Sequence, residues 1–189
     1  MATGKLIIFS APSGSGKTTI VKELLKIFPQ FEFSISATSR QPRGQEQNGV
    51  DYFFLTQDEF RAKVEADEFV EWEEVYNGTC YGTLKSEMDR IWSKGNVIIF
   101  DVDVMGGINL KRIFGDNARS IFIMPPSVEV LRERLVGRGT DSAETIEKRV
   151  AKAEFEISKA EQFDCVVVND ILAEAVAKTK EIIEEFLAE

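Results

Sequence analysis

Residues 10–19 combine the residue types that bind the phosphates of a nucleotide. They read Ser-Ala-Pro-Ser-Gly-Ser-Gly-Lys-Thr-Thr and lie between an apolar run at residues 6–9 and a helical pattern at residues 20–28. A strand, a glycine-rich turn, Lys-Thr and a helix in this order form the phosphate-binding loop of nucleotide hydrolases and kinases. A flexible Ser/Gly linker is the alternative, but a linker does not place Gly-Lys-Thr-Thr between a strand and a helix. The motif therefore predicts a nucleotide phosphate site.

Each residue type in this loop has a physical reason. Gly14 and Gly16 allow dihedrals that a β-carbon would penalise, so successive N–H groups can turn toward an anion. Lys17 is expected to reach the outer phosphates of ATP, and the Thr18 hydroxyl to join the oxygen shell of Mg2+. The strict motif begins with glycine, whereas this chain has Ala11, which fits if its φ is negative. The residues expected to bind ATP are Ala11, Pro12, Ser13, Gly14, Ser15, Gly16, Lys17, Thr18 and Thr19.

Composition restricts the classes of function. A chain of 189 residues is long enough for one domain with a sizeable core. The net charge of −9 argues against a protein that binds nucleic acid without sequence preference. The chain has no histidine, which excludes Ser-His-Asp and Cys-His catalysis and the usual histidine-bearing zinc sites. Phosphoryl transfer remains, because it depends mainly on positioning and on cations.

The cellular context follows from apolar runs and cysteines. Every apolar run is too short to span a membrane, and the N-terminus lacks a basic segment followed by an apolar one. The two cysteines, Cys80 and Cys165, lie far apart without metal-like spacing. We therefore expect reduced thiols in a cytoplasmic protein that has neither a membrane nor a nucleic acid as partner. The oligomeric state, monomer or homodimer, stays open.

Apolar runs alternate with helical patterns along the chain. Strand-like runs occur at residues 6–9, 97–100, 120–123 and 165–168, and helical patterns at residues 20–28, 84–92, 128–136, 143–162 and 171–187. This alternation predicts an α/β fold with a mostly parallel sheet flanked by helices. Residues 31–82 are instead rich in aromatic residues and turn signals, so we expect an inserted lobe of short strands. Residues 136–141 place an arginine between two glycines, which suits a mobile flap.

The inserted lobe carries groups that suit an anionic second substrate. A stiff proline separates Arg40 from Arg43, and arginine forks match phosphate oxygens bidentately. The hydroxyls of Tyr52 and Tyr81 could donate to the same anion. For an isolated pair of arginines, a solvated surface would be the preferred interpretation. Two further residues of the lobe favour a binding site.

Glu71 and Thr83 together suit a guanine base. Guanine presents adjacent N–H donors at N1 and N2, and one carboxylate can accept both, while Thr83 could donate to O6. Adenine lacks the N1 proton, so such a site would reject it by leaving buried polar groups unpaired. Alone, Glu71 would be interpreted as a surface charge, because Glu73 and Glu74 follow it closely.

The order and spacing of these motifs resemble the guanylate kinase family over nearly the full chain. The matching segments are residues 34–43, 48–52, 68–72, 81–83, 101–103, 134–140 and 168–170. The resemblance implies an enzyme of purine nucleotide metabolism that phosphorylates GMP to GDP with ATP and Mg2+, with dGMP as a further expected acceptor. It also implies that the GMP site is lined by Ser36, Arg40, Arg43, Tyr52, Glu71, Tyr81 and Thr83.

The same resemblance implies a three-part architecture inside one domain, residues 4–185. The P-loop kinase core would comprise residues 4–33, 84–126 and 164–185, the inserted nucleoside-monophosphate-binding lobe about residues 34–83, and the lid about residues 127–163. The chain departs from the family pattern at Ala11. It also departs at Gly106, where the family often has glutamine, and at Cys80, where an aromatic residue is common.

Two acids follow the strand-like run at residues 97–100. Asp101 is well placed for magnesium waters or for the acceptor nucleotide, although a loop-capping aspartate is an equal alternative when it is considered alone. The resemblance favours a functional role for Asp101 and extends it to Asp103. The sequence does not divide the metal and nucleotide contacts between them. The expected metal ligands are Thr18 and Asp101.

Three arginines are expected to act with Lys17 in catalysis. Arg134 and Arg138 are four residues apart and would share one face of a helix that reaches so far. Arg149 lies on the next predicted helix. In guanylate-kinase-like enzymes, arginines at these places converge on the transferred phosphoryl group as the lid closes.

Two other functions stay open from the sequence. A non-catalytic peptide-binding module of this family characteristically loses the loop lysine or the acceptor arginines, and this chain retains Lys17, Arg40 and Arg43. A kinase of a phosphorylated sugar would share the phosphate loop. A sugar phosphate, however, has no pair of donors for the carboxylate of Glu71, so the guanine prediction is preferred.

Overall fold

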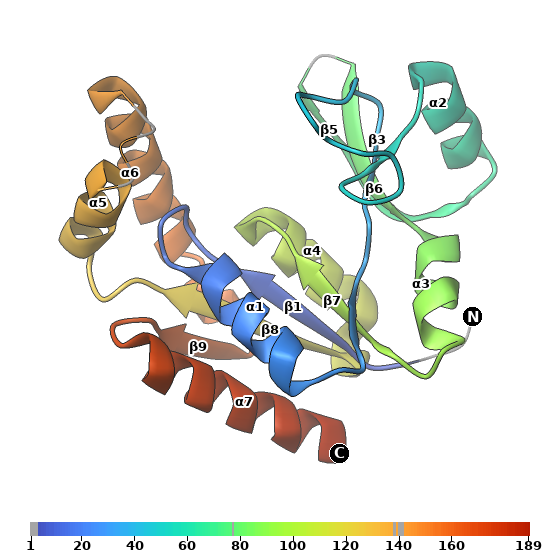
Figure 1. Cartoon of the computed structure of the whole chain (residues 1–189). Helices are drawn as coiled ribbons and strands as arrows, with labels where there is room; N and C mark the ends of the chain where they lie inside the picture. Colours follow the sequence, from blue (N-terminus) through green and yellow to red (C-terminus); the bar gives the residue numbers. More distant parts are fainter. Residues whose placement is uncertain (1–3, 77, 138, 140–141) are drawn as a thin grey trace. The chain divides into compact units, whose positions relative to one another are not determined.

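A computed structural model describes residues 4–76, 78–137, 139 and 142–189 (Figure 1). The described chain forms two compact units. The smaller unit comprises residues 32–98 with Gly4, and the larger unit comprises residues 5–31 and 99–189. The predicted phosphate loop belongs to the larger unit, and the predicted acceptor residues belong to the smaller unit.

The central sheet has five strands in the order β2-β7-β1-β8-β9. Their bounds are Phe31–Phe33, Val97–Asp101, Leu6–Ser10, Ala118–Met124 and Cys165–Val168. β8 pairs in parallel with β1 on one side and with β9 on the other. The first four residues of β1 have no exposed surface, which is typical of a parallel strand covered on both faces. These strands end on the side where the predicted phosphate loop begins.

Helices of the larger unit cover this sheet. α1 packs beside α7, and α4 packs against β1 and β8; in Figure 1, α1 and α7 lie in front of the sheet and α4 behind it. α5 and α6 pack against each other through Leu131, Leu135, Ile146, Val150 and Ala153. The bounds are Lys17–Ile27 for α1, Val104–Phe114 for α4, Val128–Gly137 for α5, Ala143–Ile157 for α6 and Leu172–Ala188 for α7. Short 3-10 turns span Gly115–Asn117 and Ala160–Gln162.

The smaller unit contains a four-stranded sheet in the order β4-β3-β6-β5. The bounds are Phe53–Phe54, Ala37–Thr38, Thr79–Leu84 and Phe69–Tyr76. β5 and β6 pair antiparallel, so consecutive residues of each alternate between the two faces. Helix α2, Gln57–Glu65, packs Phe60 against Phe69 with ring centroids 4.5 Å apart. Helix α3, Lys85–Trp92, follows β6 directly.

The parallel α/β architecture predicted from the sequence is confirmed, whereas several elements differ from the prediction. Two helices, α2 and α4, were not predicted from the sequence. Because α2 lies within residues 31–82, the inserted segment is more than a lobe of short strands. The helix predicted over residues 143–162 ends at Ile157 and gives way to a 3-10 turn. Ser142 caps α6 by accepting a hydrogen bond from the Thr145 N–H. Both cysteines are free, as expected.

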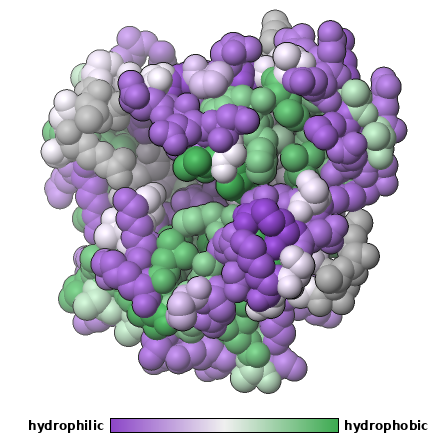
Figure 2. Space-filling model, turned by 45° about the vertical axis from the view of Figure 1, so that its right-hand side comes forward, coloured by the Kyte–Doolittle hydropathy of each residue, from purple (hydrophilic) through white to green (hydrophobic). Residues whose placement is uncertain are grey.

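Hydrophilic residues make up most of the face drawn in Figure 2, and hydrophobic residues form smaller groups among them. In the described part of the chain, helices of the length and apolar character that would cross a membrane are absent.

Candidate active site

The phosphate loop connects β1, which ends at Ser10, to α1, which begins at Lys17. Gly14 and Gly16 have φ values of 101° and 87°, in the left-handed region that glycine adopts without a steric penalty. Ala11 is outside that region, so the departure from the strict motif is accommodated by its backbone. α1 begins directly after this loop, and the first N–H groups of a helix are the donors that an anion site requires.

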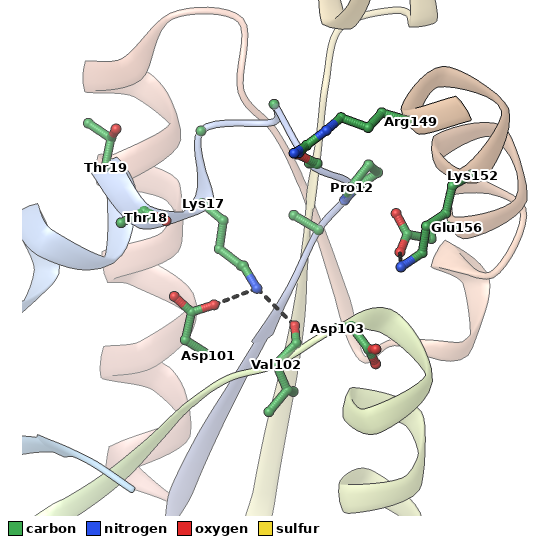
Figure 3. A pocket seen from close by; sticks show the side chains of 14 residues that line it. Pro12, Lys17, Thr18, Thr19, Asp101, Val102, Asp103, Arg149, Lys152 and Glu156 are labelled. Atoms are coloured by element: carbon green, nitrogen blue, oxygen red, sulfur yellow. Dashed lines mark hydrogen bonds and ion pairs between the residues drawn. The ribbon is translucent and has the colours of Figure 1, made fainter. Parts of the chain in front are cut away.

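A hollow of about 510 Å³ lies beside this loop (Figure 3). It brings together eight of the nine predicted ATP-binding residues with both predicted aspartates and one predicted arginine. Its lining consists of Ala11, Pro12, Ser13, Gly14, Gly16, Lys17, Thr18, Thr19, Asp101, Val102, Asp103, Arg149, Lys152 and Glu156. Ser15, the remaining predicted loop residue, is fully buried.

Lys17 is held at the end of β7 by two acceptors. Its ammonium forms an ion pair with Asp101 and donates to the carbonyl oxygen of Val102 at 2.8 Å (Figure 3). The side chain is 17% exposed, so the charge lies in the hollow rather than on the outer surface. A phosphate that enters the hollow would replace or share these partners.

Asp103 has a capping role, which the sequence had offered as an alternative for Asp101. Its Oδ1 accepts a hydrogen bond from the Gly106 N–H at 2.8 Å and thereby caps α4. Asp101 instead faces Lys17. The two acids therefore differ, because one carboxylate oxygen of Asp103 is already committed to the start of a helix.

The donor set of the hollow fits magnesium. Thr18 and Asp101 both line it and offer the hard oxygen ligands that Mg2+ prefers. Mg2+ in kinase sites usually takes one or two carboxylates and completes its shell with phosphate oxygens and water. Both residues lie next to the place where the loop would hold those phosphates.

Helix α6 brings Arg149, one of the predicted catalytic arginines, to the phosphate loop. Its Nη1 donates to Ser13 Oγ at 2.6 Å, and Figure 3 shows the side chain extended toward Pro12. Lys152 and Glu156 line the same hollow but were missed from the sequence; their charged atoms are 3.5 Å apart. Burial raises the pKa of the Glu156 carboxyl, and the charge of Lys152 opposes this rise. The signal that could have found them is their spacing from Arg149, three and seven residues along one helix.

A second hollow, of about 290 Å³, lies beside the loop. It is lined by Gly14, Gly16, Thr19, Arg134, Asn169, Asp170 and Leu172. Arg134 donates from Nη2 to the Asn169 carbonyl oxygen at 2.9 Å, so it lies near the loop but apart from Lys17 and Arg149. Asn169 lies in the matching segment 168–170, but no role was predicted for it from the sequence. Arg138, the fourth predicted catalytic residue, lies outside the described residues.

Asn169 connects three elements at this hollow. Its buried side-chain amide donates to the Ser15 carbonyl oxygen at 2.7 Å, and its own N–H donates to the Met124 carbonyl oxygen at 2.8 Å. A β-carbon at Gly16 would collide with this amide. The close approach is therefore a second reason for glycine at that position, besides its positive φ.

In the smaller unit, Arg40 gathers several of the predicted acceptor residues. Its Nε donates to the Tyr81 hydroxyl at 3.1 Å, and its guanidinium lies over the Tyr52 ring, 4.9 Å from the centroid. The other two guanidinium nitrogens, Nη1 and Nη2, donate to the carboxylate of Glu46. Glu46 was not among the residues predicted from the sequence. Arg43 is exposed and approaches this carboxylate through its backbone N–H. Ser36 is half-buried, and its carbonyl oxygen accepts from the Phe53 N–H.

The two predicted base-reading residues are also brought together. Glu71 and Thr83 lie opposite each other on β5 and β6, and the Thr83 hydroxyl donates to Glu71 Oε1 at 2.8 Å. Thr83 is 2% exposed. To donate to a guanine O6, as predicted, this hydroxyl would have to turn away from Glu71. The pair places a carboxylate and a hydroxyl side by side on one face of the sheet.

A family model for guanylate kinase matches residues 3–186 of this chain. The chain belongs to the guanylate kinase family. It is 58% identical over 185 residues to a guanylate kinase of Bacteroides thetaiotaomicron, a match that covers 98% of this chain and 91% of the relative. It is 55% identical to a guanylate kinase of Porphyromonas gingivalis, with 97% and 98% covered. The crystal structure of guanylate kinase from Anaplasma phagocytophilum superimposes with a TM-score of 0.71 at 29% identity, covering 98% of this chain and 87% of that one.

Membership of the guanylate kinase family agrees with the division of the candidate site. The residues predicted to bind ATP lie in the larger unit, and the predicted acceptor residues around Arg40 and Glu71 lie in the smaller unit. Within each unit, described residues of the predicted site form hydrogen bonds or ion pairs with one another.

Proposed function

We propose that this member of the guanylate kinase family transfers the γ-phosphoryl group of ATP to GMP and forms ADP and GDP. The observation that carries the proposal is the pairing of Glu71 with Thr83 at 2.8 Å, because a carboxylate so placed matches the adjacent N1 and N2 donors of guanine. The phosphate loop with Lys17 supports the donor half of the reaction. The family membership supports both halves.

The donor residues would act by positioning and by charge. Loop N–H groups and the N-terminus of α1 would hold the phosphate chain of ATP, and Lys17 would exchange part of its contact with Asp101 for phosphate oxygens. Arg149 would add a second positive charge from α6. A magnesium ion held by Thr18 and Asp101 would supply further charge neutralisation. We propose that Arg134 and Arg138 also contribute, as the sequence predicts.

The acceptor residues would present the GMP phosphate to the donor. Arg40, Arg43 and the hydroxyls of Tyr52 and Tyr81 would bind its oxygens, and one of those oxygens would attack the γ-phosphorus. The bond from that phosphorus to the bridging oxygen would break, and ADP would leave with the electron pair. Charge on the transferred group spreads over its equatorial oxygens, where fixed cations stabilise it most.

Several finer predictions accompany this proposal. We propose that the hollow at Arg134 and Asn169 would receive the nucleoside part of ATP, since it flanks the same loop. The three-part division into core, lobe and lid, a role for Ser36 and Asp103 in binding GMP, and the use of dGMP stay predictions. So does the cytoplasmic location.

The experiment that tests the proposal is an assay of ADP release with each nucleoside monophosphate offered in turn. We expect GMP to be a far better acceptor than AMP, CMP or UMP. Release of ADP with a phosphorylated sugar but without GMP would replace the proposal with the sugar-kinase alternative. If ADP is not released with any acceptor although GMP binds, the binding-module alternative is correct.

A further inference from the structure

Helix α2 and the strands β5 and β6 line a hollow of about 310 Å³ in the smaller unit, which we call the α2 hollow. Its volume lies at the lower end of the range in which proteins bind small organic molecules. The sequence predicted a role in binding ATP or GMP for none of its residues. They are Ser39, Gln57, Phe60, Arg61, Val64, Glu65, Trp72, Glu74, Gly78 and Cys80.

The strand register separates the α2 hollow from the predicted guanine site. Consecutive side chains of a strand point to opposite faces, so Trp72 and Glu71 of β5 lie on different faces of the sheet. Cys80 and Tyr81 of β6 differ in the same way. The ring of Phe60 on α2 lies 6.3 Å from that of Trp72, measured between centroids, so α2 covers the Trp72 face. A ligand in the α2 hollow would therefore bind on the face opposite Glu71 and Tyr81.

The interior of the α2 hollow is apolar. Phe60 is 1% exposed and meets the Trp72 ring edge-on, while Trp72 is 47% exposed and keeps much of its surface in water. Val64 and Cys80 pack against the buried cluster that contains Phe60. Cys80 stands where the family commonly has an aromatic residue, and a ring at this position would extend into the space that the cysteine leaves. A planar ring that enters the hollow would therefore bury apolar surface and stack on Trp72.

Hydrogen bonds fix one wall of the α2 hollow. The Gln57 side-chain amide donates to the Gly78 carbonyl oxygen at 3.1 Å, and the Gly78 N–H donates to Glu74 Oε1 at 2.7 Å. On α2, Arg61 and Glu65 are exposed. The lining thus has two carboxylates, Glu65 and Glu74, and one guanidinium, Arg61, so that its net charge is −1. This negative balance favours a positively charged ligand.

We propose that the α2 hollow is a binding site for a small planar aromatic cation. The ring of the ligand would stack on Trp72, and its positive group would lie near Glu65 and Glu74. The face of a tryptophan attracts a cation, and the two carboxylates add to this attraction. An aromatic anion of the same size would be repelled, and an aliphatic cation would lack the ring contact. The inference does not depend on the proposed function, because none of the lining residues has a part in the proposed phosphoryl transfer.

The test uses benzamidinium as the probe and three relatives that each change one of its features. Benzamide has the ring without the charge, acetamidinium has the charge without the ring, and benzoate has the ring with the opposite charge. NMR follows the indole Nε1–H signal of Trp72, which Trp92→Phe assigns, since the chain has two tryptophans. We expect benzamidinium to bind with a Kd of roughly 1 mM and the other three roughly tenfold more weakly. An indole signal that benzamidinium leaves unshifted, or benzoate that binds as tightly, would overturn the proposal.

Two substitutions in the interior test the location of the probe. Trp72→Ala removes the stacking surface, and Cys80→Phe fills the hollow with a ring. We expect each to weaken benzamidinium roughly tenfold, measured on the amide N–H of Val64, while dispersed amide signals show that the fold is kept. If both folded variants bind as the wild type does, the probe lies elsewhere and the proposal is wrong.

Substitutions of the charged residues have opposite expected signs. Glu65→Gln and Glu74→Gln each remove a negative charge and should weaken benzamidinium by roughly two- to fivefold. Arg61→Gln removes the opposing charge and should tighten binding by a similar factor. Glu68→Gln is the matched control, because it removes an acid of the same unit that pairs with Lys63 outside the hollow. An unchanged affinity in all three variants of the hollow, or the same change in the control, would refute the role of charge.

Two further measurements test the other sites and occupants. An amidinium could also bind the Glu71 carboxylate on the other face, so the titration is repeated in Glu71→Gln, where we expect the same affinity at Trp72. A lower affinity there would place the probe at the predicted guanine site and overturn the proposal. We expect the same sedimentation for the wild type and Trp72→Ala; a dimer that this variant dissociates would mean that a second copy covers the hollow, which contradicts the proposal. If the wild type fails to phosphorylate GMP, the proposed function is wrong, while these titrations still decide what the α2 hollow binds.

Discussion

Three cations of the candidate site have partners within the protein. Lys17 pairs with Asp101, Arg149 contacts Ser13, and the fork of Arg40 holds a carboxylate. Under the proposed function, nucleotide binding at these residues would be an exchange of partners, in which phosphate oxygens take over donors that are already aligned. The cost of orienting long side chains is met during folding, which favours binding once a ligand arrives.

Replacing Lys17 with methionine should abolish phosphoryl transfer and leave the fold intact. Methionine fills a similar volume, but it removes the charge that stabilises phosphate oxygens in the transition state. We expect a loss of roughly a thousandfold in kcat, the scale seen when one preorganised group is removed. A coupled ADP-release assay measures the loss, and circular dichroism checks the fold. Near-normal turnover by the folded variant would exclude the proposed role of Lys17.

Replacing Glu71 with glutamine should damage the recognition of guanine. Glutamine keeps the length and can still accept the Thr83 hydroxyl, but its amide presents a donor to a guanine N–H. We expect GMP turnover to fall by up to roughly ten-thousandfold, because buried donors would oppose each other, while ATP binding is unchanged. Steady-state kinetics with GMP and calorimetry with an ATP analogue measure both quantities.

Two other bases check this interpretation of Glu71. IMP keeps N1–H and O6 but lacks the 2-amino group, so it should fall between GMP and AMP as a substrate of the wild type. If AMP matched GMP in kcat/KM, the guanine assignment would be wrong although the kinase assignment stood.

At the scale of elements, β9 supports the phosphate loop from the edge of the sheet. Asn169, directly after β9, holds the Ser15 carbonyl oxygen of the loop and accepts Arg134 of α5 on its backbone carbonyl. Asn169 thus connects the phosphate loop, the end of β9 and helix α5 through its hydrogen bonds. The geometry of the phosphate site depends on β9 as well as on the glycines of the loop.

The exchange of Asn169 for aspartate tests this support. An aspartate carboxylate cannot donate a hydrogen bond to the Ser15 carbonyl oxygen. Because the contact is buried, the negative carboxylate oxygens would also repel the carbonyl oxygen. We expect the free energy of unfolding to fall by about 1–3 kcal/mol, the cost of a buried unsatisfied polar group, and ATP to bind more weakly. Urea unfolding and calorimetry measure the two effects. Asn109→Asp is the control, because Asn109 accepts from Arg112 in an exposed pair that aspartate would preserve; an equal effect in both variants would contradict the assigned role.

At the scale of the whole molecule, the chain enters the smaller unit at Glu32 and leaves it after residue 98. Glu32 accepts hydrogen bonds from Lys94 and Asn96, near the exit, and forms an ion pair with Arg90. Burial opposes ionisation of Glu32, but these hydrogen bonds outweigh it and lower its pKa from 4.5 to about 2. The two ends of the unit are thus joined by one carboxylate.

This carboxylate predicts a pH dependence of stability. The folded pKa of Glu32 lies below the ordinary value, so the folded protein binds fewer protons than the unfolded chain between pH 4.5 and about 2. The contribution of Glu32 is therefore complete above pH 4.5 and is lost as the pH falls toward 2. Urea unfolding across this range should show a smaller decline for Glu32→Gln than for the wild type. An identical decline would refute the coupling.

How much could be predicted from the sequence depended on how local each signal was. The phosphate loop and the parallel strands are contiguous patterns, so Lys17, Thr18 and the buried run of β1 were found directly. α2 was missed because it buries a single apolar residue, Phe60. Glu46 and Glu156 were missed because acids are usually solvated, and their partners become neighbours through turns and helix spacing that charge alone does not reveal. Arg40, Tyr81, Glu71 and Thr83 were found as a group, while the bonds between them required the strand register.

The bond from Asn169 to the loop has a consequence for the order of events during synthesis. It joins residues 154 positions apart, and β1, which leads into the loop, pairs with β8 at residues 118–124. A ribosome releases the N-terminus first, so the loop emerges long before the residues that support it. Folding cannot therefore begin at the nucleotide site and spread outward, since contacts so distant in the chain close late. A newly made chain should acquire affinity for ATP only after Asn169 has emerged and can dock against the loop.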